Sequence, residues 1–314
     1  MLLRLVQLSS KAFFNEADRA VKAQQGANVH ESDNPSQNSA GKSSTNQPKA
    51  IPGLEGKSAA HGARLQGETS SDSPMNELTD RSKRSIASKP RHIAGPQLKH
   101  FDGRDVLFLF PDGSGTAQMY PNINTGSRLS IYGFDSPYLG HIGAWSRGVG
   151  ELVDQYVEML CRAQPQGPYR LGGWSIGGVV VLEVCRRLLS LGHEVAFVGL
   201  IDTPSPLQIK PIPTGTLDEM LGRITSATVR EHFRSCALSL PGYRCLAFAE
   251  TDAKPAKITV VNAAHDSGLK PVMASEPEWR TFWSDTAHLA WHQVAGDHWT
   301  CLEPALRLLV ESAL

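Results

Sequence analysis

The chain is 314 residues long and carries 31 basic and 31 acidic side chains, so its formal net charge is zero. This balance, with no basic side chains interleaved among aromatic ones, excludes a nucleic-acid-binding surface. No apolar run reaches the roughly 20 residues that a membrane-crossing helix needs, so no transmembrane segment is expected. The five cysteines are scattered without the spacing of a metal site, which predicts no bound metal and favours a reducing, cytoplasmic location.

Residues 1–97 are expected to form a mostly disordered arm in front of a single folded domain at 98–314. From about residue 24 to residue 96, Ser, Gly, Asn, Gln, Lys and Pro dominate. Such a composition buries too little apolar surface to offset the entropy of ordering. Residues 1–23 differ, because their apolar side chains have the spacing of a short amphipathic helix; a frayed or partner-docking helix explains them better than a targeting signal.

Strands alternate with helices through the predicted domain. Strand patterns lie at 105–110, 129–132, 169–174, 195–201, 258–261 and 289–294, and helical patterns at 150–163, 176–191 and from about 303. This alternation is typical of a mostly parallel sheet with helices on both faces, in which ligands bind at the carboxyl ends of the strands. The sequence therefore predicts an α/β fold.

Residues 203–257 interrupt the alternation and are expected to form a helical lid. The segment opens with four prolines and then offers two helical stretches with capping-box patterns at 216–219 and 228–231. Its apolar side chains either line an acyl pocket or anchor the lid on the body, and both interpretations stay open. These side chains are Met220, Leu221, Ile224, Phe233 and Leu238.

Ser175 lies in GGWSIGG at 172–178, where a short apolar strand gives way to a helical pattern. Gly173 and Gly177 remove the side chains that would collide at a sharp strand-to-helix turn. Such a turn exposes the serine hydroxyl and aims the N–H groups of the following helix at the reacting centre. Ser175 is therefore predicted to be a nucleophile for acyl transfer rather than a structural turn serine.

A serine nucleophile needs a general base, and the base needs an acid that orients it. His298 is predicted to be the base, because it follows the last strand in a glycine-opened loop from which an imidazole can reach the elbow. His292, inside the strand, and His288, at its start, compete on proximity. Asp202, at a strand end, is favoured as the acid over Asp266, which lies in a loop after the next strand.

The loop PDGSG at 111–115 ends the first strand of the domain and is expected to present bare backbone N–H groups. The N–H of Gly113 and that of Ile176, directly after the serine, are predicted to hold the oxyanion. A phosphate cradle is a weaker interpretation of this loop, because no P-loop lysine follows.

Several segments together resemble the thioesterase domains that end modular synthases, most closely the type I thioesterases of fungal non-reducing polyketide synthases, in the α/β-hydrolase superfamily. The segments are FLFPDGSG at 108–115, IYGFDSPY at 131–138, QPQGPY at 164–169, GGWSIGG at 172–178, LIDTP at 200–204 and GDHW at 296–299. The resemblance covers residues 106–314. It implies an α/β-hydrolase fold, Asp202 as the acid, His298 as the base and the Gly113 loop as an oxyanion donor.

The resemblance also implies a substrate, an acyl or polyketide chain carried as a thioester on a phosphopantetheine arm, and no resident cofactor. Ser175 would take the chain as an acyl-enzyme, and water, a hydroxyl or an internal enolate would release it. The sequence contains no carrier-protein motif and no other synthase domain, so the expectation is a free-standing thioesterase. Its partner would be a polyketide synthase or acyl carrier protein in trans, or a coenzyme A ester. The alternatives are a general carboxylesterase or lipase on the same triad and a non-catalytic synthase-binding module.

Overall fold

The computed structural model describes residues 89–314, apart from 102–104, 127, 142 and 285–287. The helix predicted at 1–23 and nearly all of the predicted arm lie outside the described residues. Within them, the strands form a seven-stranded sheet in the order β1-β3-β2-β4-β5-β6-β7. Only β1 pairs antiparallel, with β3, and the remaining pairs are parallel. The mostly parallel sheet predicted from the sequence is confirmed.

The strands are β1 (Arg91–Ala94), β2 (Val106–Phe110), β3 (Ser130–Gly133), β4 (Tyr169–Trp174), β5 (Val195–Ile201), β6 (Ile258–Ala263) and β7 (Leu289–Val294). The helices are α3 (Gly148–Ala163), α4 (Ile176–Ser190), α5 (Thr214–Arg223), α6 (Ala227–Ser239), α7 (Glu276–Trp283) and α8 (Leu302–Ala313), with short 3-10 turns η1 (Ala117–Met119) and η2 (Ala144–Arg147).

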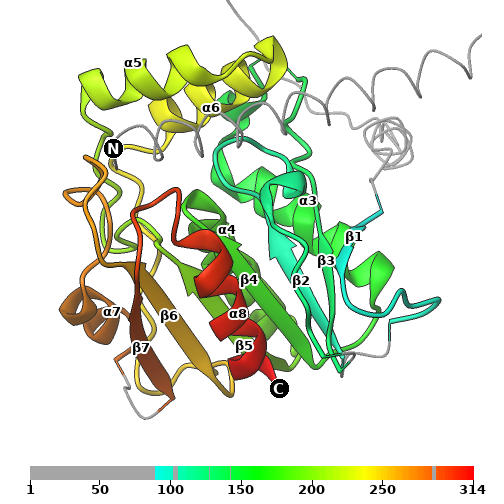
Figure 1. Ribbon diagram of the computed structural model, residues 1–314. Helices are drawn as coiled ribbons and strands as arrows, with labels where there is room; N and C mark the ends of the chain where they lie inside the picture. The colour runs from blue at the N-terminus through cyan, green and yellow to red at the C-terminus, as the bar shows by residue number, and fades with distance from the viewer. Residues whose placement is uncertain (1–88, 102–104, 127, 142, 285–287) are drawn as a thin grey trace, which may run out of the picture. The chain divides into compact units, whose positions relative to one another are not determined.

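Each face of the sheet carries its own apolar core. Phe108 and Phe110 of β2 point to the face covered by α3, α4 and α7, whereas Leu107 and Leu109 point to the face covered by α8. Figure 1 shows α8 on one side of the sheet with α3 and α4 on the other. A strand buried on both faces reads as a continuous apolar run, which is why β2 was recognisable in the sequence.

The last residues of the predicted disordered arm form a strand, so the expectation of disorder up to residue 96 is wrong for Arg91–Ala94. Arg91 pairs with Asp135 at 3.3 Å, and the ring of His92 packs edge-on against Tyr132. The tetrapeptide RHIA has no strand pattern of its own. Its conformation depends on pairing with β3, a contact that composition does not reveal.

The two helices of the 203–257 segment begin earlier than the predicted capping boxes. In α5 the preceding residue is Pro213, which makes no side-chain cap, although its carbonyl accepts the N–H of Leu217. In α6 the cap is Ser226, whose hydroxyl accepts the N–H of Val229 at 3.3 Å. A capping box forms instead at the start of α7, a helix that was not predicted, between Ser275 and Glu278.

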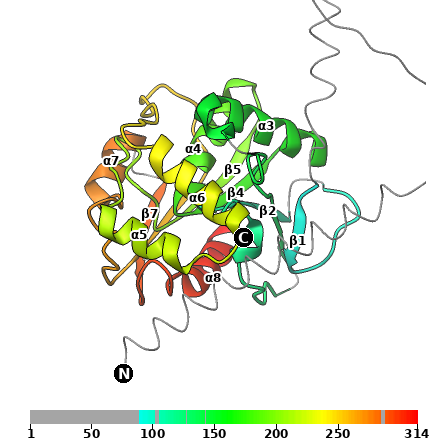
Figure 2. The same cartoon turned by 90° about the horizontal axis from the view of Figure 1, so that it is seen from above.

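Helices α5 and α6 lie across the carboxyl ends of the parallel strands, as Figures 1 and 2 show from two directions. They therefore cover the edge of the sheet where this class of fold binds its ligands. Among the helices of the described residues, none is long and apolar enough to span a bilayer.

Candidate active site

Ser175 occupies a sharp turn between β4 and α4. Its backbone has φ 56° and ψ −130°, a strained conformation for a residue with a side chain. Its N–H donates to the carbonyl of Ile201 at 2.9 Å, which ties the turn to the end of β5. A Cβ on Gly173 would lie 2.3 Å from the Gly177 carbonyl carbon, and one on Gly177 would lie 2.5 Å from the Phe110 carbonyl oxygen. A side chain at either position would collide with the neighbouring backbone, so both residues must be glycine, as the sequence predicted.

The hydroxyl of Tyr120 links the ends of β2 and β4, at the point where the turn begins. Its hydroxyl donates to the Phe110 carbonyl at 2.5 Å and accepts the N–H of Trp174 at 2.9 Å. A phenol thus bridges two strand ends that are paired by the backbone one step earlier, at Phe110 and Gly173. This bridge could not be predicted from local sequence, because the bond to Trp174 spans 54 residues.

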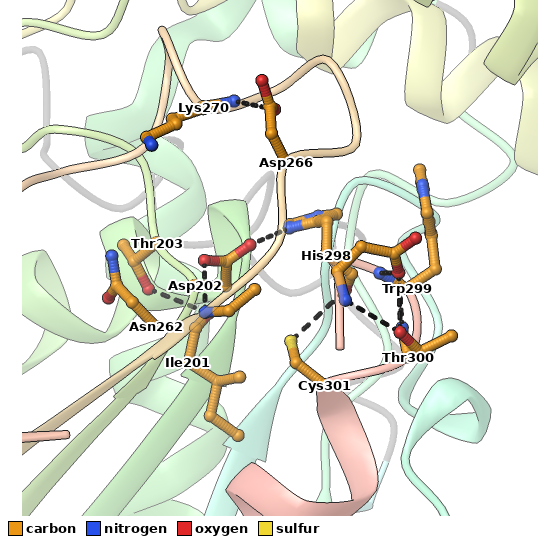
Figure 3. Close-up of polar contacts among 12 residues, drawn as sticks. Ile201, Asp202, Thr203, Asn262, Asp266, Lys270, His298, Trp299, Thr300 and Cys301 are labelled. Atoms are coloured by element: carbon orange, nitrogen blue, oxygen red, sulfur yellow. Dashed lines mark hydrogen bonds and ion pairs between the residues drawn. The ribbon is translucent and has the colours of Figure 1, made fainter. Parts of the chain in front are cut away.

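His298 and Asp202 are joined by a hydrogen bond of 2.6 Å between Nδ1 and Oδ2, and each residue is only 3% exposed (Figure 3). A carboxylate only accepts, so Nδ1 carries the proton and Nε2 is left as the acceptor. The second oxygen of Asp202 accepts the N–H of Ala263 at 3.0 Å. Burial raises the pKa of Asp202, but the bonds from His298 and Ala263 outweigh it and hold the pKa below its usual range. The carboxylate therefore stays charged near neutral pH and orients the ring.

The loop that carries His298 is held by its own hydrogen bonds. Asp297 Oδ1 accepts the N–H groups of Trp299 and Thr300, each at 3.0 Å. The imidazole packs against Trp174, with ring centroids 5.0 Å apart. Ser175 and His298 line the same cavity, but no hydrogen bond joins them in the part of the chain that is described. Such contacts are often long before substrate binds.

The competing candidates lie elsewhere. Asp266 is exposed and uses Oδ1 to accept the N–H groups of Gly268 and Lys270, so it closes a turn rather than reaching His298 (Figure 3). His292 lies within β7 opposite Val261, and His288 is exposed at the start of that strand. Neither histidine lines the cavity that contains Ser175. The geometry thus favours Asp202 and His298 over these alternatives.

The turn at 112–115 presents the Gly113 amide. The Asp112 carbonyl accepts the N–H of Gly115 at 3.0 Å, and in a trans peptide the N–H points opposite to the carbonyl. The Gly113 N–H therefore points out of the turn. Among the described residues, neither Gly113 nor Ile176 gives its N–H to a protein acceptor, and both line the cavity with Ser175. Two free donors beside a serine suit the binding of an oxyanion.

Asp112 adds a buried carboxyl that was not predicted from the sequence. It is 4% exposed and lines the cavity with Ser175 and His298. Burial raises its pKa from 3.8 to about 6, although the hydroxyl and N–H of Ser114, both bonded to Oδ1, act in the opposite direction. One feature of the sequence does point to Asp112 as a site residue. It lies directly before the predicted oxyanion glycine and shortly after a fully apolar strand.

The cavity beside Ser175 has a volume of about 60 Å³ and a mostly apolar lining. Ligand sites for drug-sized molecules usually measure about 300–1,000 Å³, so this cavity is too small to enclose such a molecule. Of the five apolar side chains considered in the sequence, Met220 and Phe233 line the cavity, Leu221 and Ile224 are buried beneath the helices, and Leu238 is 67% exposed. A larger cavity of about 460 Å³ is lined by Asp202 but not by Ser175 or His298.

Comparison with known proteins gives a family match over most of the folded region. The model of the thioesterase domain family matches residues 105–312, which confirms the resemblance found in the motifs. Similar curated proteins include the non-reducing polyketide synthase crz7 of Cladonia metacorallifera, 29% identical over 208 residues, covering 62% of this chain and 10% of the synthase. The conidial pigment polyketide synthase PfmaE of Pestalotiopsis fici is 36% identical over 120 residues, covering 38% of this chain and 6% of the synthase. The chain thus spans about a tenth or less of these relatives.

Solved structures show the same fold. The type II thioesterase BorB from the borrelidin biosynthetic cluster has a TM-score of 0.52 at 19% identity, over 73% of this chain and 97% of BorB. The NocB thioesterase domain, in covalent complex with a fluorophosphonate nocardicin G analog, has a TM-score of 0.50 at 21% identity, over 66% of this chain and 92% of that domain. At these identities the likeness establishes the α/β-hydrolase fold.

The hydrogen bond to His298 discriminates between the two candidate acids. A proton held on Nδ1 at 2.6 Å from a carboxylate is charge-assisted and should give a strongly deshielded proton NMR signal. We expect Asp202→Asn to abolish this signal and Asp266→Asn, the matched control, to leave it unchanged. Loss of the signal in Asp266→Asn alone would assign the orienting role to Asp266.

The raised pKa of Asp112 predicts a pH-dependent stability. The pKa of Asp112 is about 6 in the folded protein and 3.8 ordinarily, so the folded state binds this proton more tightly than the unfolded state. Protonation of Asp112 therefore contributes fully to the free energy of unfolding below pH 3.8, and this contribution is lost as the pH rises through 6. Asp112→Asn keeps the Oδ1 acceptor and cannot ionise. Its free energy of unfolding should therefore increase relative to the wild type as the pH rises from about 4 to about 7 in urea titrations. A difference that does not vary with pH contradicts this.

Proposed function

The chain belongs to the thioesterase domain family, and from this premise we propose that it transfers an acyl or polyketide chain from a thioester to Ser175 and then releases it. The family is one of enzymes of the serine-hydrolase type. One observation carries the assignment of roles. Ser175 stands at positive φ on the β4–α4 turn and shares a cavity with His298, whose Nδ1 is held by Asp202.

In the first half-reaction, Ser175 Oγ attacks the thioester carbonyl while its proton passes to Nε2 of His298. The carbonyl oxygen becomes an oxyanion and accepts the N–H groups of Gly113 and Ile176. When this intermediate collapses, the carbon–sulfur bond breaks and the Nε2 proton moves to the leaving thiolate. The charged carboxylate of Asp202 stabilises the imidazolium that forms between these two proton transfers.

The second half-reaction regenerates the serine. A water molecule gives a proton to His298 and attacks the acyl ester, and the same two N–H groups hold the new oxyanion. Collapse breaks the bond from the acyl carbon to Oγ, the Nε2 proton returns to Oγ, and a carboxylic acid leaves. A hydroxyl or an enolate carbon of the chain, attacking in place of water, would release a lactone or a carbocycle. Every step uses the substrate and the protein's own groups.

The substrate class is inferred from the relatives. Several of the similar curated proteins are named as non-reducing polyketide synthases, and the resembling segments are spread from the 108–115 loop to the His298 loop. An apolar lining beside Ser175 suits a hydrocarbon-rich chain better than a charged one. We assign the thioester to a phosphopantetheine arm, on an acyl carrier protein or polyketide synthase acting in trans or on coenzyme A.

The nucleophile is tested by removing its hydroxyl. Ser175→Ala should lower the turnover of an acyl thioester by about 10⁴ or more, because the acyl-enzyme can no longer form. A fluorophosphonate probe should label the wild type at this residue and should not label the variant, whose circular dichroism should match the wild type. Retained turnover contradicts the role of Ser175. Failure of the folded wild type to react with the probe favours a non-catalytic binding module.

The substrate class is tested by comparing leaving groups on one acyl chain. We expect kcat/KM to be higher for thioesters on a separately supplied holo-carrier protein or on coenzyme A than for the simple ethyl oxygen ester. The thioester carbonyl is the better electrophile, and the carrier adds binding energy of its own. A strong preference for the oxygen ester would assign a general carboxylesterase. Mass spectrometry of the product then separates hydrolysis from cyclisation.

A further inference from the structure

Helix α6 packs directly on the turn that presents the Gly113 amide, through the adjacent residues His232 and Phe233. A Cβ on Gly113 would lie 2.8 Å from the Phe233 ring, and one on Gly115 would lie 2.7 Å from His232 Cε1. Gly115 also has a φ of +77°. The two glycines therefore do more than shape the turn, because without them α6 could not approach it.

His232 makes a hydrogen bond from each ring nitrogen. Nδ1 lies 2.9 Å from the Gly113 carbonyl and Nε2 lies 2.8 Å from the Ser136 hydroxyl. A carbonyl only accepts, so Nδ1 donates, and Nε2 then accepts the hydroxyl proton of Ser136. The ring is 5% exposed and packs edge-on against Trp145. Burial lowers the pKa of His232 to about 4, so the neutral ring keeps this pattern of bonds near neutral pH.

These bonds join the insertion to the body of the domain at the predicted oxyanion site. Ser136, in the loop after β3, donates its own N–H to the Gly115 carbonyl at 2.8 Å. Within the described residues, the Gly113 carbonyl thus accepts a hydrogen bond from α6, and the Gly115 carbonyl accepts one from the loop after β3. The peptide that carries the Gly113 N–H is held on one side by the bond from the Gly115 N–H to the Asp112 carbonyl. Gly113 has no side chain to restrain rotation between this peptide and the next one, so the bond from His232 to the Gly113 carbonyl holds the other side.

We propose that His232 is a positioning residue that fixes the Gly113 N–H through the Gly113 carbonyl, so that seating α6 and completing the oxyanion site are one event. This inference rests on the function proposed above. The cavity of about 60 Å³ is too small to enclose an acyl chain, and Phe233 of its lining is the neighbour of His232. A displacement of α6 that widens the cavity therefore also pulls on the bond to Gly113.

Two variants of similar size separate the hydrogen bond from simple packing. His232→Asn places an amide N–H close to the position of Nδ1 and keeps a donor for the Gly113 carbonyl, whereas His232→Leu fills the space without a donor. We expect His232→Leu to lower kcat by about 10- to 100-fold with little change in KM, less than the 10²–10³ of losing an oxyanion donor outright. His232→Asn should recover most of this loss. Equal kcat in His232→Leu and the wild type, or equal losses in the two variants, overturns the inference.

A second measurement reports on the oxyanion itself. An acyl trifluoromethyl ketone forms a tetrahedral oxyanion on a serine, whereas the matching carboxylic acid product only occupies the cavity. In His232→Leu, affinity for the ketone should fall in proportion to kcat/KM, and affinity for the acid should not change. Equal losses for both ligands would show a general packing defect and overturn the inference.

The outcome is distinguishable from failure of the proposed function. A wild type without thioesterase activity refutes the function, whereas an active wild type with an unaffected His232→Leu refutes only the role of His232. If His232→Leu does not fold, Ser136→Ala takes its place, because it removes the hydroxyl on Nε2 and leaves the backbone bond to Gly115 intact. The change also removes the acceptor of the Tyr138 N–H, so the ketone and acid affinities are compared for this variant too. A lower kcat at unchanged KM in Ser136→Ala supports the inference, and wild-type kinetics overturn it.

Discussion

The hydrogen bond between His298 and Asp202 joins residues 96 positions apart, and the site can form only where the sheet brings their segments together. The parallel register of β4 and β5 aligns Trp174 with Ile201, so Ser175 and Asp202 both follow directly from paired strand ends. The N–H of Ser175 then bonds to the Ile201 carbonyl, and the N–H of Asp202 to that of Val261. Both residues have positive φ, which is a strained backbone conformation. The hydrogen bonds to the adjacent strands β5 and β6 hold them in it.

Two buried carboxyls near one imidazole have opposite shifts of pKa, and their partners explain the difference. Asp202 receives a bond on each oxygen, from His298 and Ala263, and these partners outweigh the cost of burial. Among the described residues, Asp112 accepts side-chain and backbone hydrogen bonds from Ser114, both on Oδ1, and burial prevails. Environments that separate two carboxyl pKa values in this way usually divide their roles. Asp202 suits the permanent anion that orients a base, and Asp112 suits a carboxyl that gains or loses a proton at about pH 6.

The parts of the site that could be predicted are those whose signal is local. The elbow glycines, the buried strands and the positions of Asp202 and His298 just after strands are all visible in short stretches of sequence. Strand β1, Tyr120 and His232 were missed because each takes its role from a partner far along the chain. The predicted start of α5 is wrong for a different reason, because the capping-box pattern at 216–219 lies within the helix, which begins at Thr214. The catalytic roles themselves remain predictions that this geometry supports.

The way an acyl chain enters follows from what anchors the insertion. Ile224 and Val229, at the junction of α5 and α6, are fully buried in the core on the α8 face. Lifting both helices away would expose them, at a cost of about 1.5–3 kcal/mol for each side chain. Rearranging Met220 and Phe233 within the lining costs less, and methionine in particular repacks readily. Because Phe233 is the side chain against Gly113, even this smaller movement reaches the turn that would hold the oxyanion. We therefore expect substrate entry and oxyanion binding to be coupled at these residues.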